Sequence, residues 1–375
     1  MNKKKILFFI LNKKVASVFL TNHIKYLNTN FNISFLSSEK TNFLILDNRR
    51  YKNTYINISR SYNITNFILN LLKTYFFFKK NNFDLIFSLH PKIGLIISLL
   101  KSFLKLKNLH IFTGQVWVNK KHIIKYLLKL IDHFIIFKST YLLADSSNQI
   151  SFLKENNFDV TKIKLLHNGS IAGVNVNKFY KSTNNKIKFC QKFNIDKSST
   201  IILYLGRINK DKGIIDLLDA YCSMQFKYNL KCILVLVGDQ EMDIDKYLNM
   251  DPKLFKIFYF PFNKNIQYFY SIADIFCNPS HREGFGMTVI EASSSSIPVL
   301  VSNINGLKNS YILNKTAINF KVGNINDLIN KLFYLIDNKT LRNKLGENGK
   351  KFVSKYFDQE DVSKYLYNHI IEITS

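Results

Sequence analysis

Two glutamates, with seven residues between them, stand in the stretch NPSHREGFGMTVIEASSSSIPVLVS, residues 278–302. Glu283 precedes the sequence GFG, and Glu291 follows it. The apolar run that leads into this stretch, ADIFCNPS (273–280), predicts a strand, and the residues from about Met287 through the serines predict a helix. The stretch therefore reads as a strand, a loop and a helix, which is the repeating unit of an α/β fold.

The loop of this unit is suited to an anion. Gly284 and Gly286 would expose backbone amides at the N-terminus of the helix, where the helix dipole favours phosphate. Glu291 lies about one turn into the helix and could accept hydrogen bonds from ribose hydroxyls, as carboxylates do in dinucleotide sites. Glu283, on the loop, would then face a sugar attached to the nucleotide. The alternative is that both acids only cap the positive end of the helix.

A second loop repeats this arrangement. The sequence IILYLGRINKDKG (201–213) predicts a strand and a loop, followed by the helix IIDLLDAY. Arg207 and Lys212 would lie just beyond the carboxyl end of the strand, where two cations beside a helix N-terminus suit a diphosphate. Gly206 and Gly213 would let the loop turn tightly and approach a ligand. A solvated basic turn is the alternative.

Short apolar runs alternate with helical patterns along the whole chain, and this rhythm restarts after the polar stretch 180–200. We therefore expect one doubly wound, Rossmann-like α/β domain over residues 1–180 and a second over 181–357, with the linker in the polar stretch 180–200. A C-terminal helix over 358–375 could return to the first domain. Two such domains would face a central cleft, and ligands bind outside the carboxyl ends of the strands in such sheets.

The charge of the chain is uneven. Lys and Arg number 53 against 26 Asp and Glu, a formal net charge of +27. Residues 1–180 hold 27 basic and 7 acidic residues, a difference of +20, and the remainder holds 26 and 19, a difference of +7. The first half should therefore seek an anionic partner, either nucleic acid or an anionic membrane leaflet. An AT-rich genome, which enriches Lys, Asn, Ile and Phe, is the alternative.

The composition places the chain among globular proteins, with 47% hydrophobic and 21% charged residues. The apolar run in the basic start MNKKKILFFI ends near Asn12, so we expect a first strand rather than a signal peptide. The sequence has no uninterrupted apolar run of roughly eighteen residues, which predicts a cytoplasmic, peripheral protein. The cysteines lack CxxC spacing and are expected to be buried thiols: Cys190, Cys222, Cys232 and Cys277.

Taken together, the two loops resemble those of a known family. The E-x7-E spacing around GFG resembles the motif of family 4 of the retaining glycosyltransferases, which have the two-domain GT-B fold. YLGRINKDKGI is similar to the family's phosphate loop, LVLVGDQ to its strand that ends in Gly-Asp, and IPVLVSNINGL to the strand after the glutamate helix. In the first half, HIFTGQVW, LLADSSNQISFL and HNGSIAGVNVNKF resemble a branch that builds bacterial surface polysaccharides and lipid-linked glycans.

This resemblance implies a role for each loop residue. Arg207 and Lys212 would neutralise the donor diphosphate, and Glu291 would hold the ribose. Glu283, as the catalytic residue, would bind hydroxyls of the transferred sugar near the reacting carbon. The backbone groups that complete the donor site would belong to Gly206, Gly286, Met287 and Thr288.

The resemblance also implies the reaction. A hexose would pass from a nucleoside diphosphate sugar, expected to be a UDP-sugar, to a lipid-linked or polysaccharide acceptor with retention of anomeric configuration. The departing phosphate oxygen would deprotonate the acceptor on the same face of the sugar. No metal or other cofactor is expected, because fixed cations and helix dipoles would stabilise the leaving nucleoside diphosphate.

One position departs from the pattern of the family. Many relatives carry a histidine directly before the glycine of the loop HIFTGQVW, where this chain has Thr113. We therefore assign no catalytic histidine and expect His110 to be a buried residue of the strand. Thr113 and Gln115 are candidates to contact the sugar or the acceptor, and Trp117 is a candidate to pack against it. His23, at the start of a predicted helix, could face the acceptor or cap that helix.

The basic first half has a candidate purpose, because the first domain of GT-B enzymes with lipid-linked acceptors holds the acceptor and docks on the membrane. ILNLLKTYFFFKK and KKHIIKYLLKLIDHFIIFK combine apolar and lysine positions at helical spacing, which suits helices on the inner face of the plasma membrane. Amphipathic core helices explain them equally well.

The sequence argues against two other functions. A nucleotide-sugar epimerase would share the fold, but the E-x7-E spacing argues against it. A basic nucleic-acid-binding protein would suit the charge, yet the sequence shows no zinc module or RRM-type signature. We therefore do not expect nucleic acid as a partner.

Overall fold

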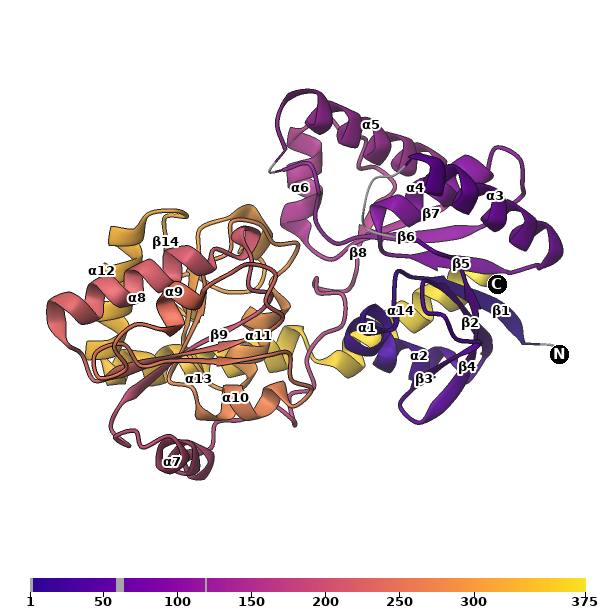
Figure 1. Cartoon of the computed structure of the whole chain (residues 1–375). Helices are drawn as coiled ribbons and strands as arrows, with labels where there is room; N and C mark the ends of the chain where they lie inside the picture. Colours follow the sequence, from indigo (N-terminus) through magenta and orange to yellow (C-terminus); the bar gives the residue numbers. More distant parts are fainter. Residues whose placement is uncertain (1–2, 59–63, 119) are drawn as a thin grey trace. The chain divides into compact units, whose positions relative to one another are not determined.

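The chain divides into two compact α/β units (Figure 1). The computed structural model describes residues 3–58, 64–118 and 120–375. Unit 1 comprises residues 1–173 and 359–375, and unit 2 comprises residues 174–358. Within the described residues, no helix is both long enough and apolar enough to cross a membrane.

Unit 1 is built on an eight-stranded sheet in the order β3-β4-β2-β1-β5-β6-β7-β8. Neighbouring strands are parallel, except that β3 and β4 are antiparallel. The strands are β1 (Lys4–Phe9), β2 (Phe31–Ser37), β3 (Phe43–Leu46), β4 (Arg49–Tyr55), β5 (Leu85–Ser88), β6 (Asn108–Phe112), β7 (Tyr141–Ala144) and β8 (Ile163–Leu165).

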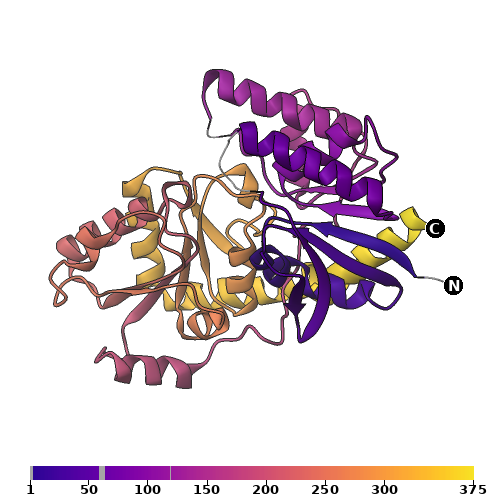
Figure 2. The same cartoon turned by 45° about the vertical axis from the view of Figure 1, so that its right-hand side comes forward.

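Helices cover both faces of this sheet. In Figures 1 and 2, α3, α4 and α5 lie on one face, and α2 and α14 lie on the other. A π-helical turn over Ala16–Leu20 joins α1 to α2. The helices are α1 (Lys13–Val15), α2 (Thr21–Leu27), α3 (Ile64–Lys80), α4 (Pro91–Leu100), α5 (His122–Lys138), α6 (Ser147–Glu155) and α14 (Gln359–Thr374).

The antiparallel hairpin at the edge of unit 1 departs from the expected alternation of strands and helices. Asp47 and Asn48 connect β3 to β4, and both have positive φ, 46° and 61°. A two-residue turn with positive φ at both positions matches the right-handed twist of the strands, and Asp and Asn tolerate this conformation. The Asp-Asn pair after the short apolar run of β3 was therefore a hairpin signal.

Helix α14 belongs to unit 1, although residues 174–358, which directly precede it, form unit 2. Its first turn is bonded to α2. Asn22 Nδ2 donates to the carbonyl oxygen of Gln359 (3.1 Å) and to Oγ of Ser363 (2.9 Å). The hydroxyl of Tyr26 donates to Oε2 of Glu360 (2.5 Å). These bonds attach the end of the chain to the first domain.

Unit 2 is a parallel six-stranded sheet in the order β11-β10-β9-β12-β13-β14. The strand order reverses between β9 and β12, so the carboxyl ends of these two strands form the topological switch point where ligands bind in such sheets. The strands are β9 (Thr200–Leu205), β10 (Cys232–Val237), β11 (Ile257–Phe260), β12 (Ile275–Asn278), β13 (Val299–Ser302) and β14 (Ala317–Phe320).

Alternate residues of these strands enter two separate cores. Residues such as Leu203 and Val235 pack against α7, α10, α11 and α13, whereas Ile202 and Leu234 pack against α8, α9 and α12. This is the side-chain alternation of a sheet that is buried on both faces. The helices are α7 (Thr183–Lys192), α8 (Ile214–Tyr228), α9 (Asp245–Leu248), α10 (Ile266–Ile272), α11 (Met287–Ser294), α12 (Ile325–Asp337) and α13 (Lys339–Tyr356).

The boundary between the units differs from the one expected at residue 180. The amide of Val174 donates to the carbonyl oxygen of Phe357 (2.8 Å), and the side chains of Val174 and Phe179 are buried in a core of unit 2. The polar stretch 180–200, predicted to be the linker, contains α7 instead. Its buried residues Phe189 and Cys190 pack into a core of unit 2. Because these apolar residues are few among polar ones, the sequence pattern did not predict the helix.

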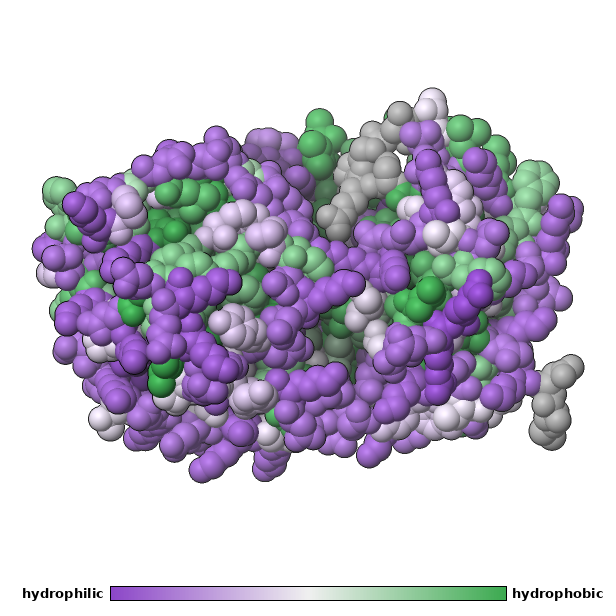
Figure 3. All heavy atoms as spheres, turned by 60° about the horizontal axis from the view of Figure 1, so that its bottom comes forward, coloured by the Kyte–Doolittle hydropathy of each residue, from purple (hydrophilic) through white to green (hydrophobic). Residues whose placement is uncertain are grey.

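In the part of the chain that the structure describes, the basic side chains are not part of the cores. Among the described residues, no Lys or Arg is buried. Hydrophilic side chains predominate on the face of the molecule in Figure 3, and hydrophobic side chains form separate patches between them. The thiols behave as expected for inert cysteines, because three are buried, the fourth, Cys222, is partly buried, and all are free.

Candidate active site

Both predicted loops lie at the switch point of unit 2. Ile275 and Phe276 of β12 pair with Ile202 and Leu203 of β9 in parallel register. The loops that follow the two strands therefore leave the same edge of the sheet side by side.

The loop after β9 is organised by its own backbone and by Asn209. Asn209 accepts a hydrogen bond from the amide of Lys212 at its Oδ1 atom (3.1 Å) and so caps the short 3-10 turn η2 (Lys210–Lys212). Gly213 follows with φ of 64°. A Cβ atom at Gly213 would lie 2.0 Å from the carbonyl oxygen of Pro279. Only glycine therefore permits the close approach of the two loops.

An ion pair joins the two loops. Nζ of Lys212 lies 2.5 Å from Oε1 of Glu283, and the hydroxyl of Ser280 donates to the same oxygen (3.0 Å). The side chains of Lys212 and Glu283 are only 20% and 14% exposed, so this charge pair is less screened by water than a surface pair.

Two further pairs hold the loops together behind this contact. Nε2 of His281 lies 2.8 Å from Oδ2 of Asp216, and Nη2 of Arg282 lies 3.0 Å from Oδ2 of Asp211. The amide of His281 also donates to the carbonyl oxygen of Asp211 (2.9 Å). The position of Glu283 is therefore set by the neighbouring loop as well as by its own.

Arg207, the second predicted cation, is bonded to an acid from a third loop. Its Nη1 atom donates to Oε1 (3.1 Å) and Oε2 (2.9 Å) of Glu241, which follows β10. Asn209 Nδ2 donates to Oε2 of Glu241 (2.6 Å). Gly206, the residue before Arg207, donates from its amide to the carbonyl oxygen of Val237 (2.9 Å), so the loops after β9 and β10 also run together.

Helix α11 begins at Met287 as predicted. Gly286 is its N-cap, with φ of 91°, and a Cβ atom there would lie 2.5 Å from Cδ2 of Leu307. Met287 and Thr288 form the first turn, whose amides point toward the N-terminal end of the helix. Asn278 Nδ2 donates to Oγ1 of Thr288 (3.3 Å) and ties this turn to the end of β12.

Glu291 lies one turn further along α11. Its Oε2 atom accepts a hydrogen bond from the hydroxyl of Tyr270 (2.8 Å). Desolvation raises the pKa of Glu291 to about 7, although the hydrogen bond from Tyr270 acts in the opposite direction. The carboxyl group therefore takes up a proton more readily than an ordinary glutamate, and when protonated it can donate a hydrogen bond as well as accept one.

The remaining predicted contacts, His23, Thr113 and Gln115, belong to unit 1. His23 is 1% exposed, and its Nε2 atom lies 2.6 Å from the carbonyl oxygen of Ile171. Contact with an acceptor stays a prediction for His23, and the burial of its ring argues against it. Thr113 is partly exposed, whereas Gln115 is buried, and its amide lies 3.3 Å from the amide oxygen of Gln149.

Trp117 does not face solvent, which corrects the expectation that it packs against a ligand. It is 1% exposed, is stacked with Phe152 and with Phe158, and donates from Nε1 to Oδ2 of Asp132 (2.8 Å). Burial raises the pKa of Asp132 to about 7. The tryptophan is therefore part of the core.

His110 lies buried inside β6, as predicted. Its Nδ1 atom lies 2.8 Å from Oγ of Ser88, while its Nε2 atom has no hydrogen-bond partner among the described residues. Burial lowers the pKa of His110 to about 3, so the ring is neutral at physiological pH.

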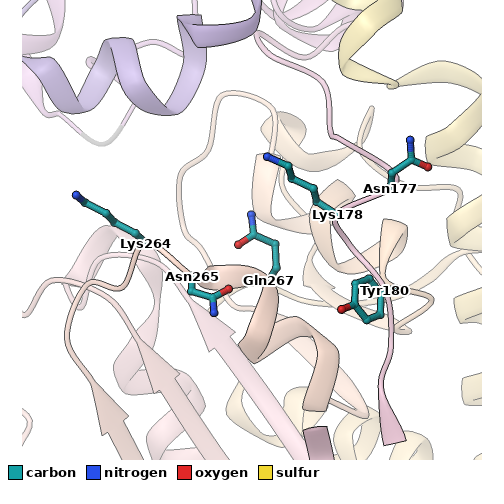
Figure 4. A pocket seen from close by; sticks show the side chains of 6 residues that line it. All are labelled: Asn177, Lys178, Tyr180, Lys264, Asn265 and Gln267. Carbon is teal, nitrogen blue, oxygen red and sulfur yellow. The ribbon is translucent and has the colours of Figure 1, made fainter. Parts of the chain in front are cut away.

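A shallow pocket of about 570 Å³ opens elsewhere on unit 2 (Figure 4). It lies between the segment that enters the unit and the beginning of α10. None of the predicted donor residues lines it, so we assign it no part in the site. Its lining residues are Asn177, Lys178, Tyr180, Lys264, Asn265 and Gln267.

Sequence reasoning missed four residues that shape the site. Asn209 was recognisable as an N-cap, since Asn is preferred where a helical turn begins. Tyr270 and Glu241 gave no local signal, because each reaches its partner from another segment. Ser280 lies in the same loop as Glu283, but a lone serine there carried no signal of its own. Within the described residues, no group of three or more His, Cys, Asp or Glu side chains could hold a metal ion.

Comparison with known proteins agrees with this geometry. Residues 185–352 match the family of group 1 glycosyl transferases. This segment contains the loops after β9, β10 and β12 and helix α11.

Two relatives extend the similarity beyond this segment. The chain is 29% identical over 308 residues to the capsular polysaccharide biosynthesis glycosyltransferase CapM of Staphylococcus aureus, covering 79% of this chain and 78% of that protein. It is 25% identical over 252 residues to the N,N'-diacetylbacillosaminyl-diphospho-undecaprenol alpha-1,3-N-acetylgalactosaminyltransferase of Campylobacter jejuni, covering 63% of this chain and 65% of that protein.

The fold is shared with solved structures over the full length. The crystal structure of Alr3699/HepE of Anabaena in complex with UDP and glucose matches with a TM-score of 0.79 at 14% identity, covering 98% of this chain and 100% of that one. The predicted fold class, a GT-B arrangement of two Rossmann-like α/β domains, is thereby confirmed.

Proposed function

We propose that this chain is a retaining hexosyltransferase that moves a sugar from a nucleoside diphosphate sugar, expected to be a UDP-sugar, to a lipid-linked or polysaccharide acceptor. The observation that carries the proposal is the 2.5 Å ion pair of Lys212 and Glu283 at the switch point of unit 2, within the segment that matches group 1 glycosyl transferases. In this proposal, Lys212 would bind phosphate and Glu283 would bind sugar hydroxyls, and their contact supports placing the two roles side by side.

The donor diphosphate would lie between the loop after β9 and the start of α11. Arg207 and Lys212 would neutralise its charge, and the first-turn amides of α11 would donate to its oxygens. Gly206 and Gly286 would let the backbone come close to the ligand. Supporting this placement, Gly213 permits the two loops to touch, so that both sets of donors leave the same edge of the sheet.

The carboxylates would serve the two sugars of the donor. Glu291, at one turn into α11, would hold the ribose hydroxyls, and its raised pKa, about 7, suits a group that exchanges hydrogen bonds with a hydroxyl. Glu283 would bind hydroxyls of the transferred hexose beside the reacting carbon. The departing phosphate oxygen would take the proton of the acceptor hydroxyl as the new bond forms on the same face, which retains the anomeric configuration.

The reaction would proceed without a metal ion. As the bond to the diphosphate breaks, negative charge grows on the phosphate oxygens, and fixed donors aimed at that charge stabilise the transition state. Arg207, Lys212 and the N-terminus of α11 would supply this stabilisation. Addition of a metal chelator would therefore leave turnover unchanged.

The acceptor is proposed to be a lipid-linked saccharide or a growing surface polysaccharide. The two relatives support this choice, one by its role in capsular polysaccharide biosynthesis and the other by a name that includes a diphospho-undecaprenol acceptor. Thr113, at the end of β6, is partly exposed and is the candidate in unit 1 for contact with the sugar or acceptor. Gln115, which is buried, would act by orienting this loop.

An anionic membrane surface, the inner face of the plasma membrane, is proposed as the second partner. An amphipathic core helix would bury its apolar side chains, whereas α3 and α5 expose many of theirs among lysines, which suits a negatively charged leaflet. Ile123 is 74% exposed and Phe137 is 72% exposed. The exposed apolar residues are Ile64, Ile68, Leu69, Leu72 and Phe76 on α3, and Ile123, Ile124, Tyr126, Leu127, Leu130 and Phe137 on α5.

Thermal unfolding in the presence of nucleotides tests the donor site. A ligand that binds only the folded chain raises its melting temperature. We expect UDP and its sugar conjugates to raise it more than GDP or ADP do, and Arg207→Ala and Lys212→Ala to abolish the shift. Lys350→Ala, which removes an exposed lysine of α13, is the matched control and should keep the shift.

Absence of any nucleotide-dependent shift would contradict the proposed donor site. A salt-sensitive gel shift with nucleic acid, without turnover of any nucleotide sugar, would instead favour the nucleic-acid-binding alternative.

A further inference from the structure

The two cations of the candidate donor site are each paired with an acid of this chain. Arg207 bonds Glu241, and Lys212 bonds Glu283. Both carboxylates act on the buried phenol of Tyr204: its pKa is raised by desolvation first and then by the charges of Glu283 and Glu241, while Arg207 opposes the rise. The hydroxyl of Tyr204 donates to the carbonyl oxygen of Arg207 (2.7 Å). The net charge of these two ion pairs is zero.

We infer that Glu241 is an internal competitor for the diphosphate: its carboxylate occupies the guanidinium of Arg207, so that a bound nucleoside diphosphate must displace it and is released more readily. This inference rests on the proposed function, since it concerns the same donor site. Glu241 would thereby set the affinity for the donor and for the nucleotide product.

The contact itself imitates a phosphate. Nη1 of Arg207 donates to both carboxylate oxygens of Glu241, and Nδ2 of Asn209 donates to one of them. Here a guanidinium and an amide bind two anionic oxygens. Arg binds the oxygens of a phosphate with the same type of contact. A phosphate group in their place would satisfy the same donors.

Backbone hydrogen bonds hold the main chain of Glu241 in place. Its amide donates to the carbonyl oxygen of Ile208 (3.0 Å), and the amide of Ile208 donates to the carbonyl oxygen of Asp239 (2.8 Å). These bonds connect the loop after β10 to the loop after β9 whether or not the carboxylate is engaged. The side chain can therefore turn away from Arg207 without moving the loop.

The two ion pairs differ in how easily they open. Arg207 and Glu241 are 39% and 36% exposed, whereas Lys212 and Glu283 are 20% and 14% exposed. Exposed pairs are screened by water and contribute little to stability, so the pair of Arg207 is the weaker one. Glu241 is thus the acid that an incoming diphosphate would displace, and Glu283 remains beside the sugar.

Calorimetric titration of the full chain with UDP and with uridine tests this inference. Glu241→Gln keeps the size and hydrogen-bonding oxygen of the side chain but removes its charge. Because a unit charge close to the diphosphate is removed, we expect the Kd for UDP to fall by about threefold to tenfold. The Kd for uridine, which has no phosphate, should not change.

The control is Glu347→Gln, which removes the same charge from an exposed position on α13. It should leave the Kd for UDP unchanged, and an equal gain in both variants would show a general charge effect and overturn the inference. An unchanged or higher Kd in Glu241→Gln would also overturn it, because Glu241 would then position Arg207 for the ligand. These failures leave the donor site intact, whereas a native chain that binds neither UDP, GDP nor pyrophosphate would overturn both the inference and the proposed function.

Discussion

Nζ of Lys212 lies 2.5 Å from Oε1 of Glu283, although 71 residues separate the two in the chain. Each residue follows a different strand, and the strands β9 and β12 are neighbours only because the order of the sheet reverses between them. The contact therefore depends on the topology of unit 2. It joins the residue expected to neutralise the diphosphate to the residue expected to hold the transferred sugar.

Glu283→Gln should separate catalysis from nucleotide binding. The amide keeps an oxygen that can accept the hydrogen bond of Ser280 but loses the charge that pairs with Lys212. We expect kcat to fall by about 10² or more, as for loss of one transition-state contact. The Kd for UDP should stay the same or fall, because Lys212 is released. Glu347→Gln is the control, and an unchanged kcat would contradict the role of Glu283.

Glu291 should make the stability of the chain depend on pH. Its pKa is raised in the folded state from 4.5 to about 7, so the folded chain binds more protons than the unfolded chain between these values, and stability falls as the pH rises through this window. Glu291→Gln removes this loss. The free energy of unfolding of the variant should exceed that of the native chain by an amount that grows from pH 5 to pH 8 and reaches at most about 3 kcal/mol. Denaturant unfolding of both chains at pH 5 and at pH 8 measures this difference in the free energy of unfolding. The same difference at both pH values would contradict the prediction.

Trp117, the only tryptophan, should report the ionisation of Asp132. Its Nε1 atom donates to Oδ2 of Asp132, and burial raises the pKa of that carboxyl to about 7. We expect the fluorescence of the native chain to titrate with a midpoint near pH 7. Asp132→Asn should stay folded and lose this transition. A transition that persists in the variant would have to come from another group.

Gly213→Ala should disrupt the site more than Gly323→Ala. Both glycines have positive φ, 64° and 73°, so both variants bear the strain of a left-handed alanine, about 1 kcal/mol. Only at Gly213 would the new Cβ collide with backbone, whereas at Gly323 the nearest atom is 3.8 Å away. We expect a larger fall in melting temperature for Gly213→Ala, together with loss of stabilisation by UDP. Equal behaviour would mean that the loops need not touch.

Replacing Ile124 and Leu127 by Gln should weaken membrane binding without unfolding unit 1. Both side chains are exposed on α5, so their removal costs little stability. We expect less of the double variant to sediment with anionic vesicles at low salt. Phe226→Gln, at an exposed position on α8 of unit 2, should sediment like the native chain. Equal sedimentation of all three would exclude α5 as the contact.

The sequence by itself determined the local units of the fold and most of the residues placed in the site. Strand, loop and helix over 273–294 were predicted because apolar periodicity and glycine act over a few neighbouring residues. The same reasoning placed Arg207 and Lys212 at the end of β9 and Glu291 one turn into α11.

Only the tertiary structure decided which of these residues are paired and which are buried. Glu241 reaches Arg207 from the loop after β10, Trp117 enters the core beside Asp132, and His23 is covered by the segment that contains Ile171. A side chain's burial and its ion-pair partner depend on segments tens of residues away, and the order of strands in the sheet sets those encounters. The local sequence pattern does not specify the order of the strands. The pairing of Glu241 with Arg207 could therefore be found only in the folded chain.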